Sequence, residues 1–149
     1  MIDYDKYNKQ IPDDMEEQVK NVAEQGDYED VPPAAYEVEI EKLELTESKK
    51  GKPMLSAWFR IIGGDYNKYM LFYNQVVDVA FGIHKANEFL KSLGTSVKVE
   101  WKNDYREYDN MILDIKEKID KSGKTFRLEY GQNEKNDFKT FDITEVYDN

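Results

Sequence analysis

The chain has 149 residues, a formal net charge of −10 at pH 7 and no cysteine. This length suits one domain with a single core, and the absence of cysteine excludes disulfides, thiolate metal sites and cysteine nucleophiles. No apolar run approaches the roughly 18 residues of a membrane span, and the start of the chain lacks the order of a signal peptide, so we expect a cytoplasmic protein without membrane contact.

The acidity is concentrated at the N-terminus. Residues 1–35 hold ten acidic and three basic side chains, a net charge of −7, whereas residues 36–149 have a net charge of −3. Within the first part, Pro12–Gln25 has the helical spacing of a short helix. We therefore expect an acidic arm over 1–33 and a folded domain over 34–149. Because that domain is nearly neutral, it is able to carry a basic groove.

An alternation of apolar and polar residues begins at Ala35 and predicts a strand. The apolar phase then slips by one residue, which predicts a β-bulge near Glu41 and Lys42. The basic turn "SKKGKP" follows, then a second strand "MLSAWFRII", a Gly-Gly-Asp turn and an aromatic third strand "NKYMLFYNQVV". The alternation in the second strand predicts a core face made of Leu55, Ala57, Phe59 and Ile61. The opposite face of that strand carries Ser56, Trp58 and Arg60.

The period then changes to 3.6 residues. The stretch "DVAFGIHKANEFLKSLG" predicts a helix with Asp78 as N-cap and Gly94 as its stop. A second helix, capped by Asn103 or Asp104, is expected to end near Lys121, and "VKVEW" before it reads as a short strand or a turn. Two strands joined by the polar loop "GQNEKND" close the pattern. Their predicted inward side chains are Phe126, Leu128 and Tyr130 on one strand, and Phe141 and Ile143 on the other.

This order of elements predicts a mainly β protein with helices. Within that class we expect an OB-fold-like five-stranded barrel with an intervening helix and one extra helix. Two alternatives remain, an α+β sandwich and a β-sheet covered on one side by both helices.

Residues 31–93 also carry a pattern shared with a known family. The matching positions are Val31-Pro32, Tyr36, Val38, Lys49–Leu55, Phe72–Gln75 and Phe81–His84. On these positions the stretch resembles an uncharacterised family encoded beside recombination and replication genes in bacteriophages of Gram-positive hosts, although Ala34 stands where that family has glycine. The resemblance implies an OB-type single-stranded DNA-binding protein in the host cytoplasm, with a phage recombinase, helicase or polymerase as further partners.

Single-stranded nucleic acid is held by cations that bind phosphates and by aromatic rings that stack on bases. Both kinds of side chain occur on the second and third strands and in the loops that an OB-fold uses for binding. Competing interpretations are a buried Trp58, an Arg60 paired with Glu39 or Glu41, and a merely solvated basic turn. The expected nucleic-acid-binding residues are Lys49, Lys50, Lys52, Trp58, Arg60, Tyr69, Tyr73, Lys135 and Lys139.

The sequence does not favour catalysis. His84 is the only histidine, and no spacing typical of zinc sites, nucleophilic triads or phosphate loops accompanies it. We expect no cofactor and no metal. The alternative function is that of an acidic phage protein that binds a host protein by imitating DNA, or that recruits a recombinase or nuclease. Self-association as a homo-oligomer stays open.

Overall fold

The computed structural model describes residues 3–13, 15, 16, 19, 31–132 and 139–148. Most of the expected Pro12–Gln25 helix lies outside these residues. A short helix that the sequence analysis did not predict, α1, precedes it and begins at the N-cap Asp3. The elements are α1 (Tyr4–Lys9), β1 (Ala34–Glu47), β2 (Pro53–Ile61), β3 (Met70–Val76), α3 (Ala80–Ser92), α4 (Tyr105–Ser122), β4 (Thr125–Gln132) and β5 (Lys139–Tyr147).

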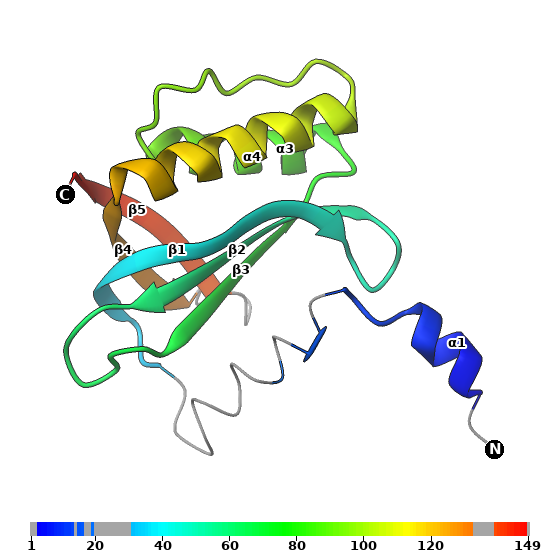
Figure 1. Ribbon diagram of the computed structural model, residues 1–149, viewed down its shortest axis with the longest axis horizontal. Helices are drawn as coiled ribbons and strands as arrows, with labels where there is room; N and C mark the ends of the chain where they lie inside the picture. The colour runs from blue at the N-terminus through cyan, green and yellow to red at the C-terminus, as the bar shows by residue number, and fades with distance from the viewer. Residues whose placement is uncertain (1–2, 14, 17–18, 20–30, 133–138, 149) are drawn as a thin grey trace.

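The five strands form one antiparallel sheet in the order β3-β2-β1-β4-β5 (Figure 1). The predicted mainly β architecture is therefore confirmed. The expected barrel is not, because the sheet is open and no hydrogen-bonded ladder joins β3 to β5 among the described residues. The two edges meet through side chains instead, since the ring of Tyr73 on β3 contacts that of Phe141 on β5 with centroids 5.4 Å apart.

The bulge predicted in β1 is confirmed. The pairing of β1 with β2 shifts between Ile40 and Lys42, so that Glu41 is an extra residue on β1. This insertion reverses the alternation along the strand. Val38 and Ile40 before the bulge and Leu43 after it consequently all face the core, with exposed fractions of 0%, 4% and 2%.

Helices α3 and α4 lie on the same side of the sheet, as Figure 1 shows. This arrangement matches the second of the two alternatives to a barrel, a β-sheet covered on one side by both helices. The end of β1 extends beyond its ladder with β4, and there Asp109 of α4 accepts a hydrogen bond from the Leu45 N–H at 3.2 Å. This contact satisfies a backbone donor in the part of β1 that lies beyond the β4 ladder.

The core joins the predicted inward face of β2 to both helices and to β4. Val31 also belongs to it, three residues before β1 begins. Among the described residues, no helix has both the length and the apolar character needed to cross a membrane. The most deeply buried members from β2, α3, α4 and β4 are Leu55, Ala57, Phe59, Ile61, Ala86, Leu90, Tyr108, Ile112, Ile115, Ile119, Phe126 and Leu128.

The helix boundaries test the predicted caps. Asp104 caps α4, accepting hydrogen bonds from the N–H groups of Arg106 and Glu107 at 2.8 and 3.1 Å, as expected. The Asp78 cap was wrong, because α3 begins at Ala80 after Val79 and has no side-chain cap. The segment "VKVEW" forms no strand. Gly94 ends α3 as predicted, with a φ of 66°.

Gly82 gives a test of how closely α3 packs on the sheet. A Cβ at this position would overlap the carbonyl oxygen of Val76. Alanine normally stabilises a helix relative to glycine by about 0.5–1 kcal/mol, but we expect Gly82→Ala to lower the free energy of unfolding by about 1–3 kcal/mol through overpacking. Denaturant unfolding measures this change, with Lys91→Ala on the exposed face of α3 as a near-neutral control. A stabilised Gly82→Ala variant would contradict the close approach.

Candidate functional site

The basic turn between β1 and β2, residues 48–52, is a well-defined loop. The Ser48 N–H donates to the carbonyl of Lys52 at 2.7 Å, the Ser48 Oγ accepts from the Lys52 N–H at 3.1 Å, and Gly51 takes a φ of 78°. Glycine adopts this left-handed conformation without strain. Lys49 and Lys50 are both exposed at the tip. The turn thus presents two cations to solvent on a fixed backbone.

The same turn is tied to the start of α3. The ammonium of Lys52 lies 3.2 Å from the carboxylate of Asp78, and the Val77 N–H donates to the carbonyl of Pro53 at 2.9 Å. These contacts explain what Asp78 does in place of capping the helix. They also place the cationic tip beside the segment that leads into α3.

The expectation that Trp58 offers an open stacking surface is wrong. Trp58 does lie on the sheet face opposite the core, but it is only 2% exposed. The edge of Phe72 packs against it with centroids 5.3 Å apart, and the ammonium of Lys42 lies 4.6 Å from the centre of its ring. Cross-strand neighbours on both β1 and β3 therefore shield the indole, because directly paired residues share a face.

Arg60 forms an ion pair with Glu41, which was one of the competing interpretations of the sequence. Its guanidinium binds the carboxylate of Glu41 through both Nε and Nη2, and its Nη1 donates to the carbonyl of Lys68 at 2.9 Å. The partner is the bulged residue of β1. Arg60 also lies at the far end of β2 from the basic turn, roughly 25 Å away at the strand rise of about 3.3 Å per residue. The two expected cationic features are consequently separate.

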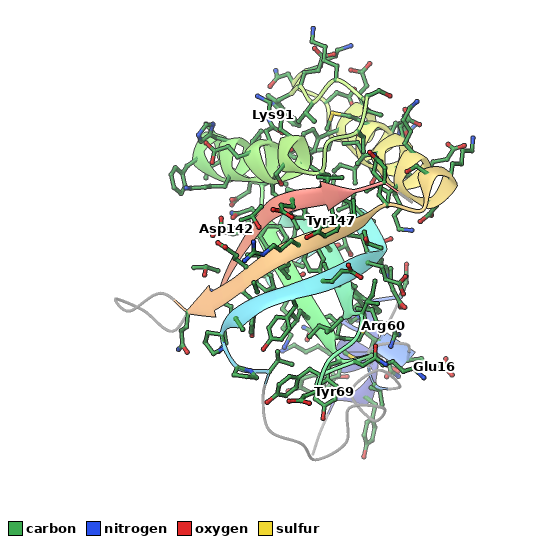
Figure 2. The ribbon with its side chains drawn as sticks, turned by 90° about the vertical axis from the view of Figure 1, so that its left-hand side faces the viewer. Glu16, Arg60, Tyr69, Lys91, Asp142 and Tyr147 are labelled. Atoms are coloured by element: carbon green, nitrogen blue, oxygen red, sulfur yellow. The ribbon has the colours of Figure 1, made fainter. Side chains whose placement is uncertain are left out.

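Tyr69 and Tyr73 do not form a common stacking surface with Trp58 either. Tyr69 packs edge-on against Tyr66, and Figure 2 shows it near Arg60 at the end of the sheet away from α3 and α4. Tyr73 points to the core face, with its ring centroid 4.6 Å from that of Phe89. Burial raises the pKa of the Tyr73 hydroxyl above its ordinary value. Tyr73 thus has a packing role in the closure of the sheet edges.

The loop between β4 and β5, residues 133–138, lies outside the described residues. Lys135 belongs to this loop. Lys139, the first residue of β5, is exposed, and its ammonium lies 3.4 Å from the Gln132 Oε1 and 5.8 Å from the centre of the Tyr130 ring. Lys139 therefore remains a candidate for phosphate contact at the end of the sheet opposite the basic turn.

A hollow of about 560 Å³ beside the basic turn is the feature that the sequence analysis missed. It lies where the segment entering α3 meets the loop entering α4. The sequence signal was weak, because Trp101 and Tyr105 are separated by 14 residues or more from the α3 residues that line the hollow, and only the fold brings them together. The lining residues are Asp78, Val79, Ala80, Ile83, His84, Asn87, Trp101, Asn103 and Tyr105.

Three aromatic rings form one side of this hollow and the layer behind it. The ring of Trp101 lies 4.9 Å from that of Tyr105, and 5.3 Å from Tyr108 in an edge-to-face arrangement. The Tyr105 hydroxyl donates to the carbonyl of Val77 at 2.8 Å, and the Tyr108 hydroxyl donates to Asn87 Oδ1 at 2.5 Å. Burial raises the pKa of Tyr108 to about 12. The rings are thus held in fixed positions.

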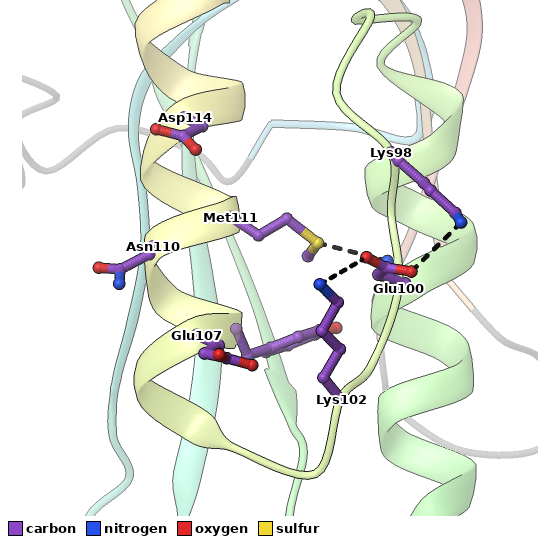
Figure 3. Close-up of a pocket in the computed structure, with 8 residues that line it drawn as sticks. Lys98, Glu100, Lys102, Glu107, Asn110, Met111 and Asp114 are labelled. Atoms are coloured by element: carbon purple, nitrogen blue, oxygen red, sulfur yellow. Dashed lines mark hydrogen bonds and ion pairs between the residues drawn. The ribbon is translucent and has the colours of Figure 1, made fainter.

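A smaller hollow of about 250 Å³ lies on the other side of the same loop (Figure 3). Glu100 stands at its centre, with the ammonium groups of Lys102 and Lys98 at 3.2 and 3.4 Å. The hydrogen bond from Lys102 is the main cause of a lowered Glu100 pKa. Because Glu100 occupies both lysines, this hollow presents paired charges and not a basic surface.

His84, the single histidine, lies on the surface of α3 beside a carboxylate. His84 is exposed and its Nε2 lies 2.9 Å from the carboxylate of Glu88, one helical turn later. No group of three or more potential metal ligands occurs within the part of the chain that the structure describes.

Comparison with known protein families gives a match over most of the chain. The sequence pattern of a protein family of unknown function, DUF669, matches residues 17–132, which include all four strands from β1 to β4 and both large helices. No curated protein matches the chain.

The burial of Trp58 leads to a prediction about stability. Trp58→Ala should lower the free energy of unfolding by about 3–5 kcal/mol, since it leaves a cavity among the neighbouring side chains. Trp58→Phe, which keeps an aromatic ring between Phe72 and Lys42, should cost clearly less. Thermal or denaturant unfolding of both variants checks this order. A Trp58→Ala variant as stable as the natural protein would show that the indole is exposed in solution.

Proposed function

The chain belongs to the DUF669 family, and we propose that it is a non-catalytic, OB-type single-stranded DNA-binding protein of a phage replication or recombination module, acting in the host cytoplasm. Single-stranded DNA is the primary partner in this proposal. A phage recombinase, helicase or polymerase is the class of protein that would act on the same strand.

The basic turn is the observation that carries the proposal. Lys49 and Lys50 are exposed at the tip of the β1–β2 connection, which is one of the two loops with which an OB-fold binds oligonucleotides. Lysine side chains neutralise phosphates and release counterions, and this effect supplies most of the sequence-independent affinity for nucleic acid. An acidic chain that keeps two exposed cations together at this position is consistent with a local phosphate contact.

The arrangement of the strands also supports an OB-type assignment. β1 pairs with both β2 and β4, and the edge strands β3 and β5 approach each other through Tyr73 and Phe141. Hydrogen bonding between these two edges is the step that would close a five-stranded Greek-key barrel. The strands of the sheet thus have the same order as in such a barrel, but the ladder between β3 and β5 that would close it is not formed among the described residues.

The charges on the outer face of the sheet restrict the path that a bound DNA strand could take. Glu37, Glu39 and Glu129 are exposed on β1 and β4, and Arg60 is engaged by Glu41. A phosphate backbone would be repelled from this part of the sheet. The proposed contact therefore centres on Lys49 and Lys50, with Lys52 close by and Lys139 as a separate contact at the other end.

The second candidate function is binding of a host or phage protein through the acidic arm. The net charge of −7 over residues 1–35 favours it, because a dense negative field attracts basic surfaces that normally bind nucleic acid. The two functions are separable. A chain that leaves oligo-dT unbound at low salt and instead binds a DNA-binding protein in competition with DNA would have the second function.

The salt dependence of oligo-dT binding tests the proposal. The logarithm of the association constant should fall linearly with the logarithm of salt concentration, with a slope of about −0.7 for each phosphate neutralised on a single strand. The double substitution Lys49→Gln/Lys50→Gln should make this slope less negative by about 1.4. Fluorescence anisotropy of a labelled oligo-dT measures both proteins across a salt series.

The matched control is Lys91→Gln/Lys118→Gln, which removes two exposed charges from α3 and α4 and should leave the slope nearly unchanged. An equal loss of slope in both double variants would indicate a general charge effect without a contact at the turn. Failure of the folded natural protein to bind oligo-dT at low salt would contradict the proposed function itself.

A further inference from the structure

We propose that the hollow between the start of α3 and the start of α4 is a base-stacking subsite for an unpaired nucleobase, with Trp101 and Tyr105 as the stacking rings. This inference rests on the proposed function and adds the place at which the strand is read by its bases. It also replaces Trp58, which is buried, as the aromatic contact.

The hollow has the size and composition of a small-ligand site. Its volume of about 560 Å³ lies within the range of about 300–1,000 Å³ found for ligand pockets. Aromatic and aliphatic walls are combined with a few polar groups. Val79, which lines the hollow, is 58% exposed, so part of the apolar wall is open to solvent.

The rings are held in place before any ligand arrives. The hydrogen bond from Tyr105 to the Val77 carbonyl fixes one ring, and Tyr108 supports Trp101 from behind. A rigid aromatic wall loses little conformational entropy when a base stacks on it. Stacking is tolerant of sequence because every base has a π-face, as a general single-strand-binding protein requires.

Polar side chains in the hollow match the edge of a base. The Oδ1 of Asn87 accepts a hydrogen bond from the Tyr108 hydroxyl, and the Asn87 NH₂ group carries two donors. Asn103 and His84 also line the hollow. Amide and imidazole groups offer both donors and acceptors, so they suit hydrogen bonding with the exposed edge of an unpaired base.

The basic turn stands next to the hollow. Asp78 lines the hollow and binds Lys52 of the turn at 3.2 Å. A DNA strand whose phosphates contact Lys49 and Lys50 would therefore be able to stack a base on Trp101 without crossing the acidic outer face of the sheet. The cations and the rings that single-strand binding requires meet at this corner of the molecule, although they are far apart in sequence.

The subsite also gives a reason for the segment Phe81-Gly82-Ile83-His84, which carried part of the family resemblance. Gly82 allows α3 to pack closely on the end of β3. Ile83 and His84 then line the hollow. The glycine sets the position, and its neighbours form the wall.

The test follows the two indole N–H signals of the full chain by ¹H–¹⁵N NMR during titration with oligo-dT, and assigns them by Trp101→Phe and Trp58→Phe. We expect the Trp101 signal to shift and the buried Trp58 signal to stay. An abasic oligonucleotide of the same length, which has the phosphates without the bases, should shift the Trp101 signal much less. Trp101→Ala should weaken oligo-dT binding by roughly 5- to 140-fold while the weak binding of the abasic strand changes little.

The outcomes separate the two proposals. If oligo-dT binds but leaves the Trp101 signal in place, and Trp101→Ala binds as well as the natural protein, the base-stacking subsite is wrong and the proposed function stands. If neither oligonucleotide binds, both are wrong. Should Trp101→Ala fail to fold, the NMR titration of the natural protein decides alone. A Trp101 shift of equal size with both oligonucleotides would also overturn the subsite.

Discussion

The double pairing of β1 is the constraint on which the rest of the structure depends. This strand forms a ladder with β4 over residues 34–38 and a ladder with β2 over residues 38–47, and the bulge at Glu41 sets which side chains of its second part face the core. Without the extra residue, Leu43 would face outward whenever Val38 faced inward. The bulge keeps both halves of β1 in one core, directs the carboxylate of Glu41 to Arg60, and leaves the second half of β1 to be covered by Asp109 and α4. The position of the basic turn follows from where β1 ends.

Local patterns were sufficient for most of the fold. Alternation identified the core face of β2, the slipped phase identified the bulge, and the cap of α4 was narrowed to Asn103 or Asp104, of which Asp104 is the cap. The closed barrel was not predictable in this way, because hydrogen bonding between β3 and β5 depends on how far the whole sheet coils, and no local residue pattern specifies that. The Asp78 cap failed for a related reason. Lys52, more than 20 residues earlier, engages its carboxylate, and a tertiary contact of this kind overrides a capping preference.

The candidate site was less predictable than the fold. The basic turn was identified correctly as a place where cations gather, since turn chemistry is local. Trp58 and Arg60 were placed on the correct face, but the neighbours that shield Trp58 and occupy Arg60 lie on other strands. The aromatic hollow was missed because Trp101 lies in an irregular segment, where neither period applies, and its partners on α3 are distant in sequence. Position on a face was therefore easier to predict than accessibility, which depends on the complete set of neighbours.

We place the proposed nucleic-acid contact at one corner of the molecule, where the turn of residues 48–52 meets the segment of residues 101–105. Hydrogen–deuterium exchange of the natural protein, measured with and without oligo-dT and resolved by peptide, tests this claim most directly. We predict slowed exchange at these two segments and at the start of α3 when the oligonucleotide is bound, with little change on the outer faces of β4 and β5. Protection confined to the outer sheet face, with none at the turn, would contradict the account.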